Sequence, residues 1–235
     1  MKALRISLRA YAIALLISCG FATTSIAGSG DFAGIYGAFT GSAGGAAING
    51  THVDQSGQRT TGQVGGVFPL AGYEVGFNLP LGPVFFLGAG HSWTKGGSAS
   101  IADGRDGANS FAADATGDDA GSLSNFHLKA KNLKEVYIMP SISIYDNSAV
   151  YVKLGRAIAD TEATGDVTGV PNNLQGDLIG IGTIAMTPSG IFIKTEGSVT
   201  RFDDLRIVGV GGSSNAVVEG SPDMVTGTVA IGFKF

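Results

Sequence analysis

The chain has 235 residues, of which 14% are charged and 44% hydrophobic, and its formal net charge is −4. The low charge is typical of membrane proteins, yet beyond the N-terminal segment no run of about 18 apolar residues could form a membrane-spanning helix. The 38 glycines favour strands, because glycine destabilises helix interiors and permits close approach of backbones. The length allows one or two domains.

The first 27 residues are typical of a signal peptide. Three basic residues precede an apolar stretch and a motif of small residues: Lys2, Arg5, Arg9, residues 10–17 and residues 25–27. We therefore expect cleavage between Ala27 and Gly28. Cleavage removes three of the 15 basic residues and leaves 12 against 19 acidic ones, a net charge of −7. Such a balance argues against a nucleic-acid partner, whose phosphates need a positive surface.

The chain contains a single cysteine, Cys19, so no disulfide can form within it. Residues 16–19 also resemble a bacterial lipobox, in which the cysteine becomes the lipidated N-terminus. Lipidation of Cys19 and cleavage before Gly28 are alternatives, and the second has the better cleavage motif.

Eight strand-like segments follow in the mature chain. They cover residues 32–39, 73–79, 84–93, 135–145, 149–159, 178–186, 191–202 and 225–235. Three of the connections are short turns rich in Pro, Gly, Asn, Asp and Ser. The other four are long and rich in Gly, Ser, Thr, Asn and Asp, and they cover residues 41–62, 94–126, 161–174 and 203–221.

Short and long connections alternate along the chain, so both termini fall on the short-turn side. Transmembrane barrels combine short periplasmic turns with long outer loops in this way. The sequence therefore predicts an all-β fold: residues 28–235 form an eight-stranded antiparallel up-and-down transmembrane β-barrel with four long surface loops.

The strands alternate apolar with small or polar residues, as a lipid-facing wall requires. In the second and last strands one face carries Tyr73, Val75, Phe77, Leu79, Val225, Val229, Ile231, Phe233 and Phe235. A soluble β-sandwich also alternates, so it stays an alternative. Arg156 shares the apolar face of its strand, and either a bulge turns it inward or its long stem reaches the membrane interface.

The chain ends in a strand with Phe233 and Phe235, two aromatic residues at alternate positions. This end resembles the signal that the barrel-assembly machinery recognises, with Ala230 where glycine is common. With the signal peptide and the hairpin pattern, the mature chain resembles the opacity-type small outer-membrane β-barrels, eight-stranded barrels like OmpA and OmpX. The resemblance implies a Gram-negative cell envelope and an integral outer-membrane location. It also implies the barrel-assembly machinery and periplasmic chaperones as partners.

Five charged residues fall on faces predicted to point inward: Glu74, Glu135, Lys153, Lys194 and Glu196. The interior of an eight-stranded barrel is only wide enough for side chains, so buried charges must pair there. We interpret these residues as a barrel-interior charge network. A gated ion path and a catalytic carboxylate pair are the alternatives.

Other polar residues give weaker indications of chemistry. Residues 114–118 only partly match a calcium-binding loop, because the closing glutamate is absent. His52, His91 and His127 lack metal-binding spacing. His91 and Ser92 are adjacent on a strand and point to opposite faces, so they are poorly placed as base and nucleophile. We predict no catalytic, metal or cofactor site, and no enzyme.

The leading functional hypothesis is a structural outer-membrane barrel whose loops serve adhesion or other envelope and surface interactions. Its partners would be outer-membrane lipid, lipopolysaccharide and a host or surface ligand of the loops. A porin-like narrow channel for small or apolar solutes is the alternative, and a lipid-modifying enzyme is a third hypothesis.

Overall fold

The computed structural model describes residues 28–53, 59–94, 98–103, 126–145, 147–165, 167–209 and 217–235, so the predicted signal peptide lies outside it. No helix within these ranges is long and apolar enough to cross a membrane. The elements are η1 (Ser29–Phe32, a 3-10 helix), β1 (Gly34–Val53), β2 (Arg59–Pro80), β3 (Phe85–Thr94), β4 (Ser98–Asp103), β5 (Phe126–Tyr145), β6 (Ser148–Gly165), β7 (Val167–Thr168), β8 (Asn173–Met186), β9 (Ile191–Phe202), β10 (Leu205–Gly209) and β11 (Val217–Lys234).

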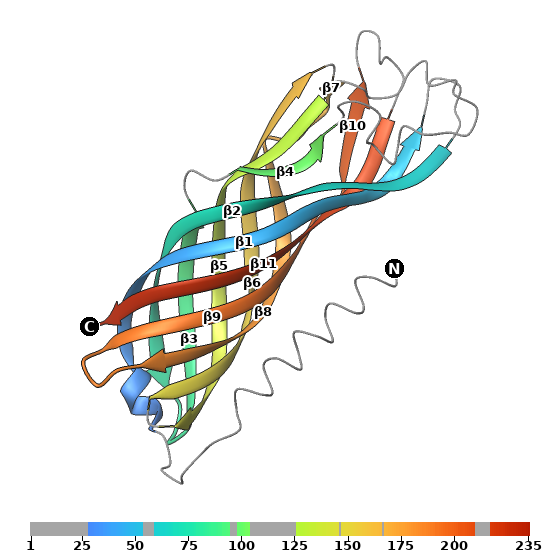
Figure 1. The fold of residues 1–235 in the computed structure, drawn as a ribbon. Helices are drawn as coiled ribbons and strands as arrows, with labels where there is room; N and C mark the ends of the chain where they lie inside the picture. The colour runs from blue at the N-terminus through green and yellow to red at the C-terminus, as the bar shows by residue number, and fades with distance from the viewer. Residues whose placement is uncertain are drawn as a thin grey trace.

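Eight strands close into an antiparallel barrel (Figure 1). Neighbours pair in the order β1, β2, β3, β5, β6, β8, β9 and β11, and β11 pairs back with β1. The closing ladder runs from Tyr36 opposite Lys234 to Val53 opposite Val217. The predicted eight-stranded fold is confirmed, and a β-sandwich is excluded. The helix η1 and the C-terminus lie at the end with the short turns, which we call the turn end; the opposite end is the loop end.

The strands reach further toward the loop end than the sequence analysis predicts. Residues 41–62, expected as a loop, are mostly a paired hairpin in which Gly41 lies opposite Ala71 and Val53 opposite Arg59. The first strand also begins at Gly34, because Phe32 belongs to η1. Glycine and serine indicate loops by composition, but paired strands satisfy their backbone groups equally well.

The other predicted loops also contain strands. β4 lies within residues 94–126 and pairs with β5. β10 lies within residues 203–221 and pairs with β11, and β7 pairs with β10. Short strands thus line the rim of the loop end instead of leaving four long loops without regular structure.

The wall changes character between the two ends. On β2, Val75 and Phe77 point outward and are 51% and 46% exposed, whereas Phe68 and Leu70 point inward and are 3% and 9% exposed. The residues predicted to face lipid on β2 and at the chain's end are all exposed, as expected for an apolar outer wall. Toward the loop end most outward positions are polar or small, although Val67 is exposed, and the larger apolar residues point inward.

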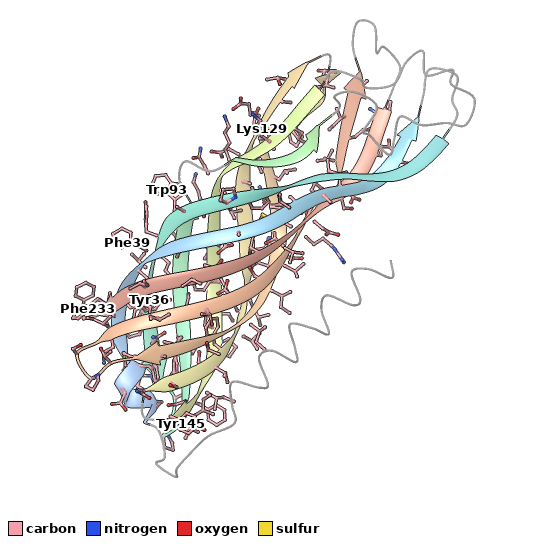
Figure 2. All side chains as sticks on the ribbon, in the orientation of Figure 1. Tyr36, Phe39, Trp93, Lys129, Tyr145 and Phe233 are labelled. Atoms are coloured by element: carbon pink, nitrogen blue, oxygen red, sulfur yellow. The ribbon has the colours of Figure 1, made fainter. Side chains whose placement is uncertain are left out.

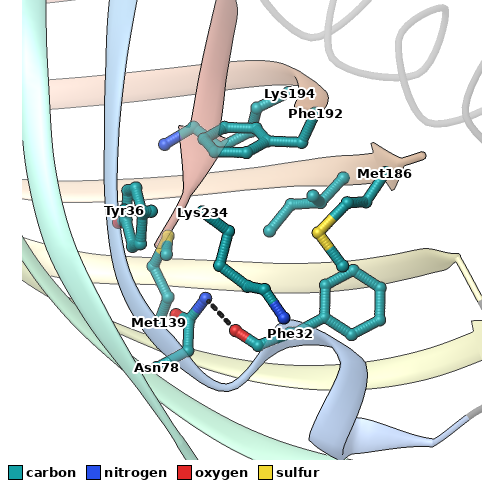
Figure 3. Close-up of a pocket in the computed structure, with 9 residues that line it drawn as sticks. Phe32, Tyr36, Asn78, Met139, Met186, Phe192, Lys194 and Lys234 are labelled. Atoms are coloured by element: carbon teal, nitrogen blue, oxygen red, sulfur yellow. Dashed lines mark hydrogen bonds between the residues drawn. The ribbon is translucent and has the colours of Figure 1, made fainter. Parts of the chain in front are cut away.

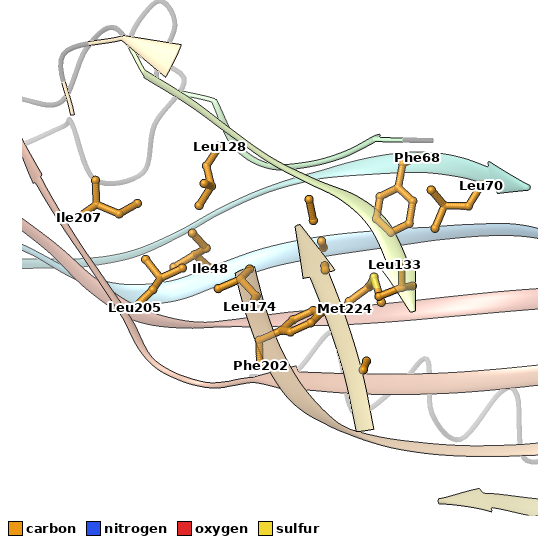
Figure 4. Packing of buried hydrophobic residues seen from close by; sticks show 14 residues of the cluster. Ile48, Phe68, Leu70, Leu128, Leu133, Leu174, Phe202, Leu205, Ile207 and Met224 are labelled. Atoms are coloured by element: carbon orange, nitrogen blue, oxygen red, sulfur yellow. The ribbon is translucent and has the colours of Figure 1, made fainter. Parts of the chain in front are cut away.

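The inward apolar residues of the loop end form one packed group, the loop-side cluster (Figure 4). Its larger members are Ile48, Phe68, Leu70, Leu128, Leu133, Leu174, Phe202, Leu205, Ile207 and Met224. They come from seven strands, including the rim strand β10. This cluster holds the extended strands together where lipid no longer surrounds them.

Interior aromatic side chains lie over glycines of the neighbouring strand. A glycine there leaves room for a ring that a larger side chain would displace. The directly opposed pairs are Tyr36 with Gly76, Tyr137 with Gly90, Tyr151 with Gly182 and Phe192 with Gly232. Part of the high glycine content therefore serves packing across the barrel wall.

Replacing Gly90 by valine should destabilise the barrel. A Cβ at Gly90 would lie 2.7 Å from the hydroxyl oxygen of Tyr137, so the ring must move. We expect a loss of about 1–3 kcal/mol in the free energy of unfolding, measured by denaturant titration of the refolded protein. Gly197→Val is the matched control, because Gly197 has no neighbour within 4 Å for a Cβ to meet. Equal losses in the two variants would contradict this explanation.

Candidate functional site

The five inward charges singled out in the sequence lie together near the middle of the barrel. They come from β2, β5, β6 and β9, and none is more than 8% exposed. We call this group the charged layer: Glu74, Glu135, Lys153, Lys194 and Glu196.

Two lysines connect the three carboxylates. Lys153 Nζ donates to Glu135 Oε2 at 2.8 Å and to Glu196 Oε1 at 2.9 Å. Lys194 Nζ donates to Glu74 Oε2 at 2.6 Å. β9 and β2 are not neighbours in the sheet, so the Lys194–Glu74 pair crosses the interior. Lys194 and Glu196 share a face of β9, as predicted, but they take different partners.

The three carboxylates also accept hydrogen bonds from hydroxyl groups, in addition to those from the two lysines. Tyr137 donates to Glu74 Oε2 at 3.2 Å, and Tyr151 donates to Glu196 Oε2 at 3.0 Å. Ser92 donates to Glu135 Oε2 at 2.7 Å. The ring of Tyr137 also lies 4.3 Å from the Nζ of Lys153, within cation–π range. The charged layer thus consists of two hydrogen-bonded groups, one around Lys153 and one around Lys194, and the contact between Lys153 and the Tyr137 ring joins them.

The helix η1 closes the turn end of the barrel. Phe32 points inward and stacks on Phe86 with ring centroids 5.0 Å apart. Asn78 Nδ2 donates to the Phe32 carbonyl at 3.0 Å (Figure 3). Lys234 Nζ donates to the Asp31 carbonyl at 2.6 Å. We call η1 with the inward Phe32 ring the plug. Strands β2 and β11 both hold it in place.

A pocket lies beside this plug (Figure 3). Met139, Met186 and Phe192 give it a largely apolar wall, and Lys194 of the charged layer also lines it. The pocket therefore reaches from the plug to the charged layer. Sequence reasoning missed the plug, because Phe32 was expected to continue the first strand.

Paired charges cross the outer wall toward the loop end, between the apolar row described below and Ile158, which is also exposed. Arg156, Asp177, Arg201 and Asp223 are directly opposed on β6, β8, β9 and β11. Arg156 Nη1 lies 2.6 Å from Asp177 Oδ1, and Arg201 Nε lies 3.2 Å from Asp223 Oδ1. Arg156 therefore points outward. Two residues nearer the turn end, the same strands carry an apolar row: Leu154, Ile179, Val199 and Val225.

The other residues considered for chemistry do not form a site among the described residues. His91 Nδ1 contacts the backbone carbonyl of Glu135 at 2.9 Å, whereas the buried Ser92 hydroxyl points inward to the Glu135 carboxylate. No group of three His, Cys, Asp or Glu side chains within the described ranges could hold a metal ion. The calcium-loop candidate, residues 114–118, lies outside those ranges.

No protein-family model matches the sequence, and no curated protein matches it. Similar solved structures include Ail, the attachment invasion locus protein of Yersinia pestis, in complex with the heparin analogue sucrose octasulfate. It is 9% identical, with 86% of this chain and 99% of that chain covered and a TM-score of 0.43.

Two further similar structures are OprG of Pseudomonas aeruginosa and the outer membrane protease OmpT of Escherichia coli. OprG is 12% identical, with 86% and 96% of the two chains covered and a TM-score of 0.45. OmpT is 11% identical, with 92% and 100% covered and a TM-score of 0.41. Such low sequence identities and TM-scores do not indicate a function for this chain.

Three features of the barrel indicate its location: a closed antiparallel sheet, an apolar outer wall and a row of paired charges that crosses this wall toward the loop end. The structure is that of an integral outer-membrane β-barrel. Closed barrels can cross lipid because they leave no strand edge unpaired, and they display an apolar band to the membrane. In barrels of this kind the short turns lie on the periplasmic side and the longer loops on the outside.

Removing one lysine of the charged layer should destabilise the barrel strongly. In Lys194→Met, Glu74 keeps Tyr137 as its only donor, because its other oxygen has no partner among the described residues. We expect a loss of about 3–5 kcal/mol in the free energy of unfolding, as for other broken buried pairs. Denaturant titration of the refolded barrel measures it.

The matched control for this variant is Lys131→Met. Lys131 pairs with Glu162 on the exposed outer wall, where such pairs contribute about 0–1 kcal/mol. The double variant Lys194→Met/Glu74→Gln should recover part of the loss, since it removes the isolated charge. A neutral Lys194→Met would show that Lys194 and Glu74 do not form a buried pair.

Proposed function

We propose that the protein is a closed, non-conducting outer-membrane barrel whose loop end makes adhesive or other surface contacts. The proposal includes a signal peptide at residues 1–27, cleaved between Ala27 and Gly28. Cleavage there would leave η1 close to the mature N-terminus. Phe233 and Phe235 would form the assembly signal read by the barrel-assembly machinery. Periplasmic chaperones and outer-membrane lipid would be further partners, and a host or surface ligand would bind the loop end.

The filled interior is the observation that carries this proposal. From the turn end upward, the lumen contains the Phe32 plug, an apolar cluster that includes Met139 and Phe192, the charged layer and the loop-side cluster. An eight-stranded barrel has no room for a passage beside such layers. With the interior occupied, the exposed rim of paired strands is the part of the molecule that can meet other molecules.

A narrow channel for small or apolar solutes is the second candidate. The pocket at the turn end favours it, because its largely apolar lining would accept a small apolar solute. The charged layer and the packed loop-side cluster separate this pocket from the loop end. Conduction would require their side chains to move apart.

Conductance of the refolded protein in planar bilayers separates the two functions. We expect no steady unitary conductance from the wild-type barrel. The variant Phe32→Ala/Tyr137→Ala/Tyr151→Ala removes three interior rings and should produce conductance steps. The control Phe39→Ala/Phe77→Ala/Phe233→Ala removes three lipid-facing rings and should stay silent. Folding of each variant is first verified by its heat-dependent gel mobility. Steady wild-type steps would favour the channel.

Assembly tests the proposed role of the C-terminal phenylalanines, whose rings lie 5.3 Å apart on the outer wall. Phe233→Ser/Phe235→Ser should accumulate as unfolded protein in the periplasm, because β11 must be recognised before it can close against β1. Phe39→Ser/Phe77→Ser also loses two lipid-facing rings but keeps the C-terminus, so it should reach the outer membrane. Cell fractionation and heat-dependent gel mobility measure both. Equal assembly of the two variants would contradict the role.

A further inference from the structure

A stripe of three lysines runs along the outer face of β5 toward the loop end. Lys129, Lys131 and Lys134 lie outward, while Leu133 between them is buried. A bulge makes this spacing possible: Asn132 has a φ of 49°, and the register with β6 shifts between Lys131 and Lys134. In an unbroken strand, alternation would place Leu133 outward with the first two lysines and turn Lys134 inward.

The stripe begins beside aromatic residues of the outer wall. Lys134 lies directly opposite Trp93 of β3, and Trp93 packs edge-on against Tyr73 of β2 with ring centroids 5.4 Å apart. Trp and Tyr concentrate at the boundary between lipid tails and headgroups. In Figure 2, Trp93 and Lys129 lie on the same side of the barrel, with Lys129 nearer the loop end. The stripe therefore extends from the membrane boundary into the headgroup region.

The neighbouring acidic residues do not neutralise the whole stripe. On β6, Glu162 pairs with Lys131, and Asp160 accepts a hydrogen bond from Asn132 at 2.9 Å. Lys129 and Lys134 have no ion-pair partner among the described residues.

Strands β6 and β9 differ in this respect. Their arginines Arg156 and Arg201 each pair with a carboxylate on the adjacent strand. Among the described residues, unpaired positive charge at the boundary therefore occurs on the β5 side.

We propose that Lys129, Lys131 and Lys134, next to Trp93, bind the phosphate groups of a lipopolysaccharide-type glycolipid in the outer leaflet. Lysine ammonium groups bind phosphate as compact point charges. From Lys129 to Lys134 the strand rises by about 13 Å, at roughly 3.3 Å per residue, because the bulge adds one residue and the paired residues Glu162 and Ile158 of β6 are only four apart. A glycerophospholipid with one phosphate occupies one depth, whereas a glycolipid with phosphates on its sugars can reach several lysines. The inference rests on the outer-membrane placement and not on whether the barrel conducts.

Trp93 is the only tryptophan in the chain, so its fluorescence reports on this site. The mature protein, refolded in neutral micelles, is titrated with bisphosphorylated lipid A, with dephosphorylated lipid A and with phosphatidylglycerol. We expect saturable emission changes with bisphosphorylated lipid A and apparent binding at least several-fold weaker for the other two lipids. Lys129→Gln/Lys131→Gln/Lys134→Gln should weaken binding of the bisphosphorylated form roughly tenfold, as three exposed charge contacts would together supply.

The control variant removes the same three charges from paired positions on the outer wall. Arg156, Arg201 and Arg206 each lie within 3.2 Å of a carboxylate, and changing all three to glutamine should leave the affinity close to wild type. Equal weakening in both triple variants would overturn the proposal, because general charge attraction would then explain the binding. Equal affinity for dephosphorylated lipid A or for phosphatidylglycerol would overturn it as well. These binding results do not depend on the conductance measurement, so failure of the lipid-binding proposal would leave the proposed non-conducting function untouched.

Discussion

The ladder between β1 and β11 is the interaction on which the rest of the structure depends. In lipid, an open strand edge would leave backbone N–H and C=O groups without partners, so a membrane sheet must close. Closing only eight strands fixes a narrow interior, which side chains must fill. The glycines opposite Tyr36, Tyr137 and Tyr151 follow from that narrowness, since each leaves space for a ring. The filled interior on which the proposed non-conducting function rests follows from the same closure.

A second constraint is that the outer wall faces lipid over part of its length and water over the rest. Val75 and Phe77 face lipid on the strand that buries Phe68 and Leu70 further along, so one strand carries both arrangements. The charges of Arg156 and its neighbours cross the outer wall between these two regions of the barrel. Toward the loop end the interior contains its own apolar core, the loop-side cluster. The rim is therefore a packed platform, which suits the proposed surface contacts better than unsupported loops.

The sequence was sufficient for features that depend on alternation alone. The lipid-facing residues Val229, Ile231 and Phe233 could be assigned, because the period of two survives in each strand of the membrane band. The strand extensions could not, because Gly, Ser and Thr satisfy loops and paired strands equally well. The partner of Lys194 was also beyond reach. Pairing across the lumen depends on how the closed barrel brings non-neighbouring strands together, and alternation within one strand carries no such information.

Replacing a buried ion network by apolar residues is often neutral or stabilising, so stability alone does not account for the five buried charges. A barrel that was apolar both inside and outside would tolerate a slip of one residue, which exchanges the two faces of a strand. In β9, such a slip would turn Lys194 and Glu196 toward lipid. A lysine at the middle of the bilayer costs about 2–4 kcal/mol, and a glutamate somewhat less. The charged layer therefore disfavours the slipped register, and it does so with the same side chains that close the lumen.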